Sequence, residues 1–305
     1  MRAVSAQGAG DARAAAGWLA ALIFLWGGNY TWVKIAMADI GPLWFNAARY
    51  GGAALLGLVA AMALGRLGAL RVARGEWPGL ALVGLLQAFT MTTMTAFAMT
   101  MISASQVVVI AYSVPVWALI WGALVLGERV TAAAAVGAAL GVAGVVILAD
   151  PFAGDGAWDA AALPGVLAAT LGVNGWALGS VLYRRRRWES GFWAQVFAQM
   201  VATALAAVAL APLTEDVSAI TLSAPMLTVA AYNALGPMLL GFYCWSQALS
   251  RVPAATAGQV MILAPVFGVA QSHLALGEPL SPNILIAGAL VLTGAWLALR
   301  RPPAP

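Results

Sequence analysis

Charged side chains are scarce in this chain of 305 residues: Asp, Glu, Lys and Arg make up 9% of the sequence, whereas hydrophobic residues make up 63%. Soluble globular proteins average about 25% charged and about 45–50% apolar residues. A soluble chain with this composition could not cover its own core with polar groups. The scarcity of charge therefore excludes an ordinary soluble protein.

Cysteine and histidine are almost absent as well, since Cys244 and His273 are single residues of their kinds. A lone cysteine excludes an intrachain disulfide. One cysteine with one histidine excludes most metal sites, which need several such ligands. We therefore expect neither a metal ion nor another cofactor.

What the chain has instead is a series of continuous apolar runs, each long enough for a helix of about 20 residues that crosses the roughly 30 Å hydrocarbon layer. The runs do not alternate with the period of two that a transmembrane barrel requires. We predict an all-α, polytopic membrane protein of ten transmembrane helices. The predicted spans are residues 17–36, 42–65, 77–99, 103–126, 130–149, 162–183, 191–213, 226–249, 253–276 and 282–300.

Basic residues fall on only one side of this arrangement. With the N-terminus in the cytoplasm, the outer loops contain no Lys or Arg, and such segregation is typical of membrane proteins whose basic loops are cytoplasmic. Both termini are therefore predicted to be cytoplasmic, and the net charge of +4 needs no nucleic-acid partner. The arginines of the cytoplasmic segments are Arg2, Arg13, Arg66, Arg71, Arg74, Arg129, Arg184, Arg185, Arg186, Arg187, Arg251, Arg300 and Arg301.

The second half of the sequence repeats features of the first at a distance of 150 residues (263 − 113 = 150). Ser113–Trp117 aligns with Leu263–Phe267, and Leu126-Gly-Glu128 aligns with Leu276-Gly-Glu278. Each half then has five spans. Because five is odd, the second half is expected to lie upside down relative to the first. Inverted repeats are frequent in secondary transporters, which bind their substrates between the repeats near the membrane midplane.

This division predicts four segments. They are a cytoplasmic N-terminal tail at residues 1–16, a first five-helix repeat at 17–149, a second and inverted five-helix repeat at 162–300, and a cytoplasmic tail at 301–305. The small residues that a signal peptidase needs come before the first apolar run rather than after it. That run is therefore expected to remain as the first span.

Two motifs and the paired proline-containing spans give the chain a family resemblance. The motifs are Trp26-Gly-Gly-Asn-Tyr-Thr-Trp-Val-Lys34 and Asn46-Ala-Ala-Arg-Tyr50. With two spans that contain proline and end in Leu-Gly-Glu, they make residues 17–300 similar to the drug/metabolite transporter superfamily, in its ten-helix EamA-type branch. The resemblance implies an exporter of small metabolites in a bacterial inner membrane. The overall likeness is greatest to exporters of aromatic or neutral amino acids, and other small metabolites or drugs are the alternative cargo.

Polar residues are concentrated in the first, third, fourth, sixth, eighth and ninth spans. Polar groups inside a membrane usually face a partner or a water-filled cavity, so we expect a central cavity between these spans. Methionine, aromatic and amide side chains suit a ligand with an apolar body and a few hydrogen-bonding groups. The alternative is that they pack the helices together. The expected substrate-binding residues are Trp26, Asn29, Tyr30, Gln87, Thr90, Met91, Met94, Tyr112, Asn174, Tyr243 and Gln259.

A second group is expected to gate or brace the protein: Lys34, Arg49, Pro115, Pro265 and Glu278. The first two are the only basic residues within the spans. We expect them either to pair with Asp39 or Glu278 and brace the outer surface, or to attract a substrate carboxylate. Pro115 and Pro265 occupy equivalent mid-span positions, where proline kinks a helix and acts as a hinge or as a fixed bend.

Carboxylates are missing from the interior of every predicted span. Proton-coupled carriers often depend on such a group, so we expect facilitated diffusion or exchange, or coupling through other groups. An intramembrane enzyme would need a nucleophile beside a base, but the single histidine lies near the end of its span and no Gly-x-Ser-Gly motif is present. A receptor or a structural protein would have no use for inverted duplication. We expect a small-molecule substrate, a lipid bilayer around the chain, and a monomer or weak homodimer.

Overall fold

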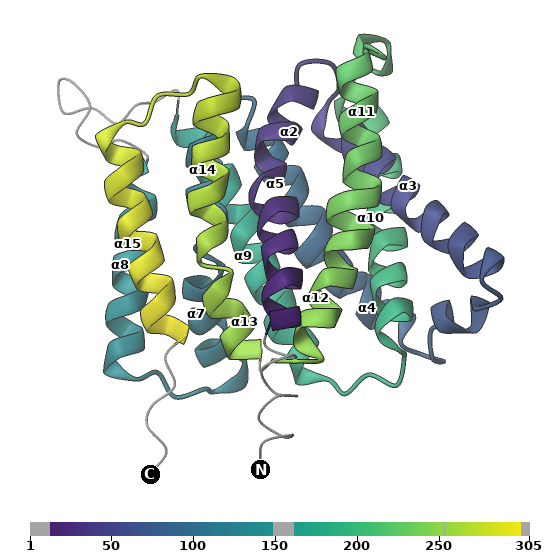
Figure 1. Ribbon diagram of the computed structural model, residues 1–305, viewed down its shortest axis with the longest axis horizontal. Coiled ribbons are helices and arrows are strands. Elements are labelled where there is room, and N and C mark those ends of the chain that lie inside the picture. The colour runs from purple at the N-terminus through teal and green to yellow at the C-terminus, as the bar shows by residue number, and fades with distance from the viewer. Residues whose placement is uncertain (1–12, 149–161, 253, 300–305) are drawn as a thin grey trace.

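The computed structural model describes residues 13–148, 162–252 and 254–299. All regular structure within these ranges is helical (Figure 1). Six helical segments there are long and apolar enough to cross a membrane, and two further apolar helices, Ala132–Leu148 and Pro282–Ala298, are shorter. The prediction of an all-helical, polytopic membrane protein is confirmed.

Besides two short 3-10 helices in loops, η2 (Leu67–Leu70) and η4 (Val217–Ala219), the described ranges form ten helical segments. Most of these begin and end within two residues of the predicted limits. The first five are residues 13–22 with η1 (Ile23–Gly27) and α2 (Asn29–Ala36); α3 (Pro42–Ala63); α4 (Trp77–Gly84) with η3 (Leu85–Thr90) and α5 (Met91–Ala98); α6 (Ala104–Ala111) with α7 (Val114–Leu126); and α8 (Ala132–Leu148). The other five are α9 (Leu163–Arg185); α10 (Phe192–Thr214); α11 (Ala224–Asn233) with η5 (Ala234–Leu240) and α12 (Gly241–Leu249); α13 (Ala254–Val260) with α14 (Leu263–Leu276); and α15 (Pro282–Leu299).

Two segments in each half are interrupted at equivalent positions. The π-helical turns η3 and η5 begin at Leu85 and Ala234, which are 149 residues apart (234 − 85 = 149). The helix also breaks at Tyr112–Ser113, between α6 and α7, and at Met261–Ile262, between α13 and α14. Such interruptions often mark functional sites, and here they recur within one residue of the spacing of the sequence repeat.

The two prolines that were expected to kink a helix lie directly after these breaks. Pro115 is in the first turn of α7, and Pro265 is in the first turn of α14. A proline has no N–H group with which to continue the preceding helical turn, so each proline accounts for the break in the middle of its span. The role of these positions as a hinge or a fixed bend stays a prediction.

The Leu-Gly-Glu motif ends a helix in each half. Gly127 follows α7 and Gly277 follows α14, and both glycines have a φ of 67°. Glycine adopts this left-handed conformation without steric cost and is the usual residue at such helix ends. The motif therefore places a carboxylate, Glu128 or Glu278, in the loop directly after each helix.

The last helices of the two halves, α8 and α15, pack against each other (left side of Figure 1). A Cβ atom at Gly137 would lie 2.7 Å from the Gly294 carbonyl oxygen, and one at Gly144 would lie 2.8 Å from the Ala287 carbonyl oxygen. Higher numbers on α8 meet lower numbers on α15, so the two helices run antiparallel. The glycines of α8 therefore join two helices of one chain.

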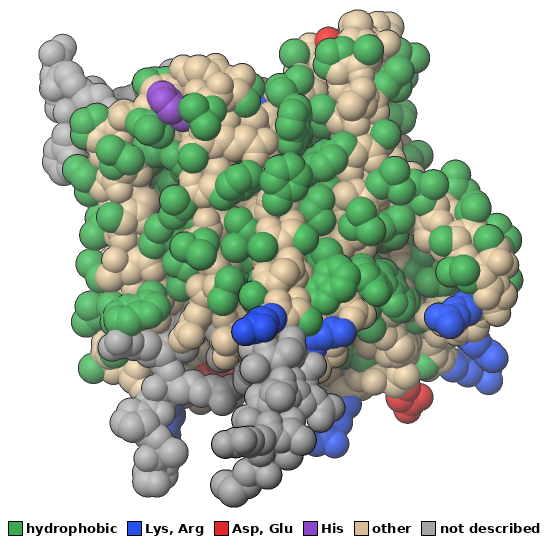
Figure 2. Space-filling view, in the orientation of Figure 1, with side chains coloured by type: hydrophobic (Ala, Val, Ile, Leu, Met, Phe, Trp, Pro, Cys, Tyr) green, Lys and Arg blue, Asp and Glu red, His purple; other side chains and the backbone are tan. Residues whose placement is uncertain are grey.

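The two ends of the bundle differ in charge. Figure 2 shows Lys and Arg side chains along the lower edge of the molecule, with a broad band of hydrophobic side chains above them. At one end, Arg184 pairs with Glu128. At the other end, Ser223 donates a hydrogen bond to Asp39, and the described loops 37–41, 99–103, 215–223 and 277–281 contain no Lys or Arg. We refer to these as the basic end and the acidic end.

Candidate functional site

Arg49 is a buried cation at the centre of the candidate site. It lies in α3, about 10 Å along the helix from Pro42, and only 2% of its surface is exposed. Its Nε donates a hydrogen bond to Asn46 Oδ1 at 2.8 Å, and its Nη1 donates one to Asn233 Oδ1 at 3.2 Å. A charged side chain inside a membrane protein is costly and usually functional, so its partners decide its role.

The partners of Arg49 hold the guanidinium in place without neutralising it. Asn46 donates from Nδ2 to Thr93 Oγ1 at 2.7 Å, and Asn233 donates from Nδ2 to the Val229 carbonyl oxygen at 3.1 Å. Each amide nitrogen is therefore engaged elsewhere, which turns the amide oxygen toward the cation. The network joins α3, α5 and α11.

Aromatic rings surround the same cation. The Phe45 and Tyr50 ring centres lie 5.1 and 5.3 Å from the guanidinium carbon of Arg49, within the range of a cation–π interaction. Tyr30 of α2 is near enough to interact electrostatically with Arg49 and with Tyr112, which lies at the break between α6 and α7. Two of the predicted substrate residues, Tyr30 and Tyr112, thus lie in one region with Arg49.

The predicted ion pair between Arg49 and Asp39 or Glu278 is not formed. Asp39 accepts a hydrogen bond from Ser223 Oγ, and Glu278 binds amide groups of α6. The prediction assumed that Arg49 extends to the membrane surface. Instead Asn233 of α11 meets its guanidinium inside the bundle.

Trp26 and Asn29 lie on the same segment as Tyr30 but make other contacts. Trp26 Nε1 donates a hydrogen bond to the Pro237 carbonyl oxygen at 3.0 Å, and its ring centre lies 5.7 Å from that of Phe242. Asn29 Oδ1 is buried and has no hydrogen-bond partner among the described residues. A buried acceptor of this kind is a position for a ligand or a water molecule.

The predicted stripe of Gln87, Thr90, Met91 and Met94 faces α9. Gln87 Nε2 donates a hydrogen bond to Ser180 Oγ at 2.6 Å. A Cβ atom at Gly175 of α9 would lie 2.8 Å from the Leu86 carbonyl oxygen, so the two backbones approach closely. In this conformation the stripe packs two helices together, which is the alternative that the sequence left open.

The remaining three predicted substrate residues make their contacts elsewhere. Asn174 Oδ1 accepts a hydrogen bond from Trp121 Nε1 at 3.0 Å, which joins α9 to α7. Tyr243 stacks on Trp193, with ring centres 6.4 Å apart. Gln259 is exposed on α13.

Three members of the Arg49 network were not among the candidates. They are Asn46, Thr93 and Asn233. Asn46 precedes Arg49 by three residues, so the two share one face of a helix, and this spacing is visible in the sequence. Asn233 is 184 positions from Arg49, and no local pattern pairs residues so far apart.

Lys34 and Glu278 connect several helices at the acidic end. Glu278 accepts hydrogen bonds from the Ala104 and Ser105 amide groups at 2.7 and 2.9 Å, and so caps the N-terminus of α6, where negative charge is favoured. Lys34 Nζ donates to the carbonyl oxygens of Met99 and Ile102, just beyond α5. Lys34 thus binds main-chain carbonyls, and it forms no ion pair with a carboxylate of the described residues.

At the basic end, Glu128 is the equivalent of Glu278 in the sequence repeat. It forms an ion pair with Arg184 at 3.0 Å. Glu76 accepts hydrogen bonds there from the Glu189 and Ser190 amide groups at 2.9 and 3.0 Å. The Ser190 hydroxyl and these amide groups hold the pKa of the Glu76 carboxyl below its ordinary value.

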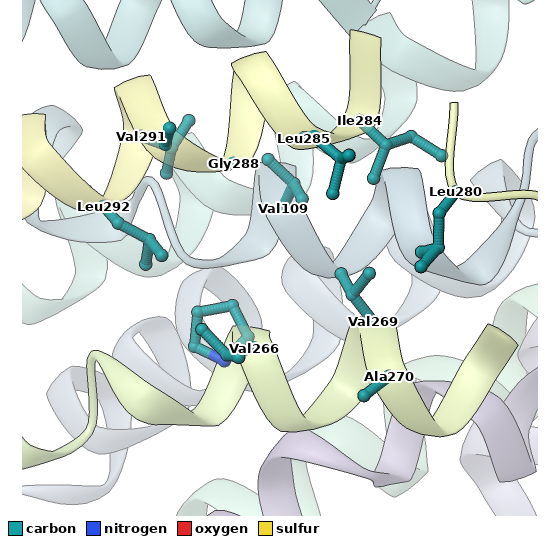
Figure 3. Close-up of a pocket in the computed structure, with 12 residues that line it drawn as sticks. Val109, Val266, Val269, Ala270, Leu280, Ile284, Leu285, Gly288, Val291 and Leu292 are labelled. Atoms are coloured by element: carbon teal, nitrogen blue, oxygen red, sulfur yellow. The ribbon is translucent and has the colours of Figure 1, made fainter. Parts of the chain in front are cut away.

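A cavity of about 380 Å³ lies between α14 and α15 (Figure 3). All of its labelled lining residues are apolar, and they include Val266 of α14 and Leu285 of α15. These two side chains are 54% and 56% exposed, so the cavity opens on the flank of the bundle. Pro265 is the only predicted site residue in its lining, and the cavity is separate from the Arg49 network.

Comparison with known proteins places the chain among transporters. The model of the EamA-like transporter family matches residues 13–149 and again residues 163–300. A crystal structure that is 24% identical in sequence superposes with a TM-score of 0.64, covering 93% of this chain and 96% of that one. At this identity the superposition shows a shared fold alone.

Three curated relatives carry names that describe transport. The uncharacterized transporter YvbV of Bacillus subtilis (strain 168) is 27% identical over 92% of this chain and 89% of its own length. The probable terminal-alkyne amino-acid exporter of Streptantibioticus cattleyicolor is 25% identical over 92% of this chain and 91% of its own length. The aromatic amino acid exporter YddG of Ancylobacter novellus is 31% identical over 62% of this chain and 64% of its own length.

Proposed function

We propose a function for this chain, which belongs to the EamA-like transporter family. It exports small neutral metabolites, and aromatic amino acids above all, by alternating access through a central cavity between its two repeats. Two relatives are named as exporters of amino acids, one of them aromatic. We place the protein in a bacterial inner membrane, as a secondary transporter rather than an enzyme.

The observation that carries this proposal is the pair of broken segments, α6–α7 and α13–α14. Their breaks, Tyr112–Ser113 and Met261–Ile262, occupy equivalent positions in the two halves. The segments also pack together, since Gly268 of α14 lies against Val108 of α6. In secondary transporters, discontinuous helices build the substrate site where inverted repeats meet. The antiparallel packing of α8 against α15 supports such an inversion here.

Alternating access fits the proposed inversion. When inverted repeats exchange conformations, one end of the transporter opens as the other closes. Glu278 caps α6 at the acidic end and so ties together two segments there. We assign this conformation to a state that is closed at the acidic end.

The surroundings of Arg49 support a neutral substrate with an aromatic part. The described acidic residues lie in loops and at helix ends, so no carboxylate is available to bind a strongly cationic ligand deep in the bundle. Several phosphates would need a cluster of buried cations, and Arg49 is the one cation buried inside the described helices. The rings of Tyr30, Tyr50 and Phe45 offer an apolar, aromatic surface.

We further propose that both termini are cytoplasmic and that the basic end faces the cytoplasm. Residues 17–149 and 162–300 are then the repeats, with short cytoplasmic tails at 1–16 and 301–305. We propose that the protein is a monomer or a weak homodimer, because Gly137 packs against Gly294 of the same chain. A reporter fused after Ser218 should be found outside and one fused after Arg187 inside. Finding both on one side would overturn the orientation and the inversion together.

Competition for transport in proteoliposomes tests the substrate. We expect unlabelled phenylalanine, tryptophan and methionine to inhibit the uptake of labelled phenylalanine by preloaded vesicles. Glutamate and a nucleotide sugar should not inhibit it. Inhibition by the last two alone would reject the proposed substrate class.

A further inference from the structure

We propose that Arg49 binds the carboxylate of the transported amino acid. The inference rests on the proposed export of amino acids, and it names the group through which the substrate is recognised. It follows from the charge of Arg49, from its unused hydrogen-bond donors and from the neutral residues that hold it.

No acidic side chain in the described part of the chain neutralises Arg49. Its hydrogen-bond partners are the two amide oxygens of Asn46 and Asn233, and its ring contacts are Phe45 and Tyr50. Burying a cation without a counter-ion costs several kcal/mol in an apolar interior. A ligand that brings the missing negative charge therefore offsets this cost and binds favourably beside Arg49.

The guanidinium also keeps donors free for a ligand. An arginine has five N–H donors, and the hydrogen bonds to Asn46 and Asn233 use one on Nε and one on Nη1. Its Nη2 has no hydrogen-bond partner among the described residues. Two adjacent nitrogens with free N–H groups match the two oxygens of a carboxylate in a bidentate arrangement.

Asn46 and Asn233 act as positioning residues for this contact. They hold Nε and Nη1 from different helices, α3 and α11, so the plane and direction of the guanidinium are fixed before a substrate binds. Because both amides are themselves hydrogen-bonded, to Thr93 and to the Val229 carbonyl, they cannot turn away easily. Preorganisation of this kind reduces the entropy that binding costs.

Lys34 is the other described Lys or Arg residue that lies away from the basic end, and its side chain is already hydrogen-bonded. Its Nζ donates hydrogen bonds to the Met99 and Ile102 carbonyl oxygens at the acidic end. A substitution of Lys34 therefore changes the charge of the bundle by the same amount as a substitution of Arg49 without touching the proposed carboxylate site. Lys34→Gln is the matched control for Arg49→Gln.

A binding experiment with pairs of amino acids and their amides tests the assignment. Purified protein in detergent is titrated with phenylalanine, tryptophan, methionine and leucine, and with the carboxamide of each, while its thermal unfolding is followed. The wild type should be stabilised by the acids at concentrations about 10- to 100-fold lower than by the amides, as expected for a charge-assisted hydrogen bond. Arg49→Gln should lose this preference, and Lys34→Gln should keep it.

A second variant distinguishes loss of the carboxylate site from loss of the folded structure. Asn233→Asp places a carboxylate beside the guanidinium and supplies an internal counter-ion. This variant should unfold at a temperature equal to or above that of the wild type, yet lose the preference for acids over amides. Equal binding of acids and amides by the wild type, or a preference that survives in Arg49→Gln or Asn233→Asp, would overturn the assignment. If the wild type binds the acids with the expected preference but does not transport them, the proposed export is rejected and the assignment of the carboxylate site to Arg49 stands.

Discussion

Glu278 and Glu128 stand 150 residues apart (278 − 128 = 150) at equivalent positions of the two repeats, and each binds groups of another helix. Glu278 accepts hydrogen bonds from the amide groups of Ala104 and Ser105, whereas Glu128 forms an ion pair with Arg184. A cap on a helix N-terminus stabilises a protein by about 1 kcal/mol. Glu278 therefore helps to close the acidic end in this conformation.

Replacing Glu278 by Gln should open the acidic end. In a Cys244→Ser background, a cysteine at position 272 reports on this end, because Ser272 is fully buried and hydrogen-bonded to Thr31. Loss of a cap worth about 1 kcal/mol corresponds to a roughly fivefold shift in population. We expect the cysteine to react about fivefold faster with a membrane-impermeant maleimide added outside cells.

Glu128→Gln is the control for that measurement, since it removes an equivalent carboxylate from the basic end. It should leave the labelling rate at position 272 unchanged or lower it. An equal increase in both variants, or no increase in either, would contradict the assignment of this conformation.

A side chain at Gly175 should destabilise the contact between η3 and α9. The Cβ atom of an alanine there would lie 2.8 Å from the Leu86 carbonyl oxygen, which is too close for an ordinary contact. Overpacking of this kind costs about 1–3 kcal/mol. We expect Gly175→Ala to lower the unfolding temperature in detergent. Gly51→Ala, whose Cβ atom would lie 3.9 Å from Ala204 Cβ, should not lower it.

Removing the charge of Lys34 should loosen the loop between α5 and α6. Hydrogen bonds to charged groups contribute about 1.5–3 kcal/mol, and Lys34 donates two, to Met99 and Ile102. We expect Lys34→Met to speed proteolysis of residues 99–103 in detergent, and Lys34→Arg to restore most of the protection. Equal cleavage rates in the wild type and Lys34→Met would show that these bonds are not needed.

The stability of the basic end should fall in acid because of Glu76. The pKa of this carboxyl is lower in the folded protein than its ordinary value of 4.5, since the Ser190 hydroxyl and the amide groups of Glu189 and Ser190 bind the charged form. Its contribution is complete above pH 4.5 and is lost as the pH falls from there through the lower folded-state pKa. The unfolding temperature of the wild type should therefore drop toward that of Glu76→Gln in this range. A constant difference between the two proteins across it would exclude this role.

The helices themselves could be predicted because lipid requires continuous apolar runs. Their limits follow from where polar residues interrupt those runs, and the repeated Leu-Gly-Glu motif gave the position of two helix ends. The breaks at Tyr112–Ser113 and Met261–Ile262 were harder to predict from the sequence. A proline in the middle of an apolar run indicates a disturbed helix but does not distinguish a kink from a new start.

The candidate site depends on long-range contacts that no local pattern reveals. The polar stripe that includes Gln87 and Met91 has the composition of a binding surface, but the glycines of α9 decide that it packs against a helix. One of the two roles expected for Arg49, an ion pair that braces the outer surface, assumes that its side chain extends to that surface. Inside the bundle, its guanidinium binds Asn233, which lies in the other half of the chain.

Exchange across a membrane without an ion gradient tests the account most directly. Proteoliposomes are loaded with labelled phenylalanine, with the same pH and salt on both sides and no sodium. Unlabelled phenylalanine added outside should accelerate the loss of label, because a carrier that returns loaded reorients faster than one that returns empty, and liposomes without protein should retain the label. Efflux that strictly requires a proton or sodium gradient, or no efflux of any aromatic amino acid, would contradict alternating access by exchange.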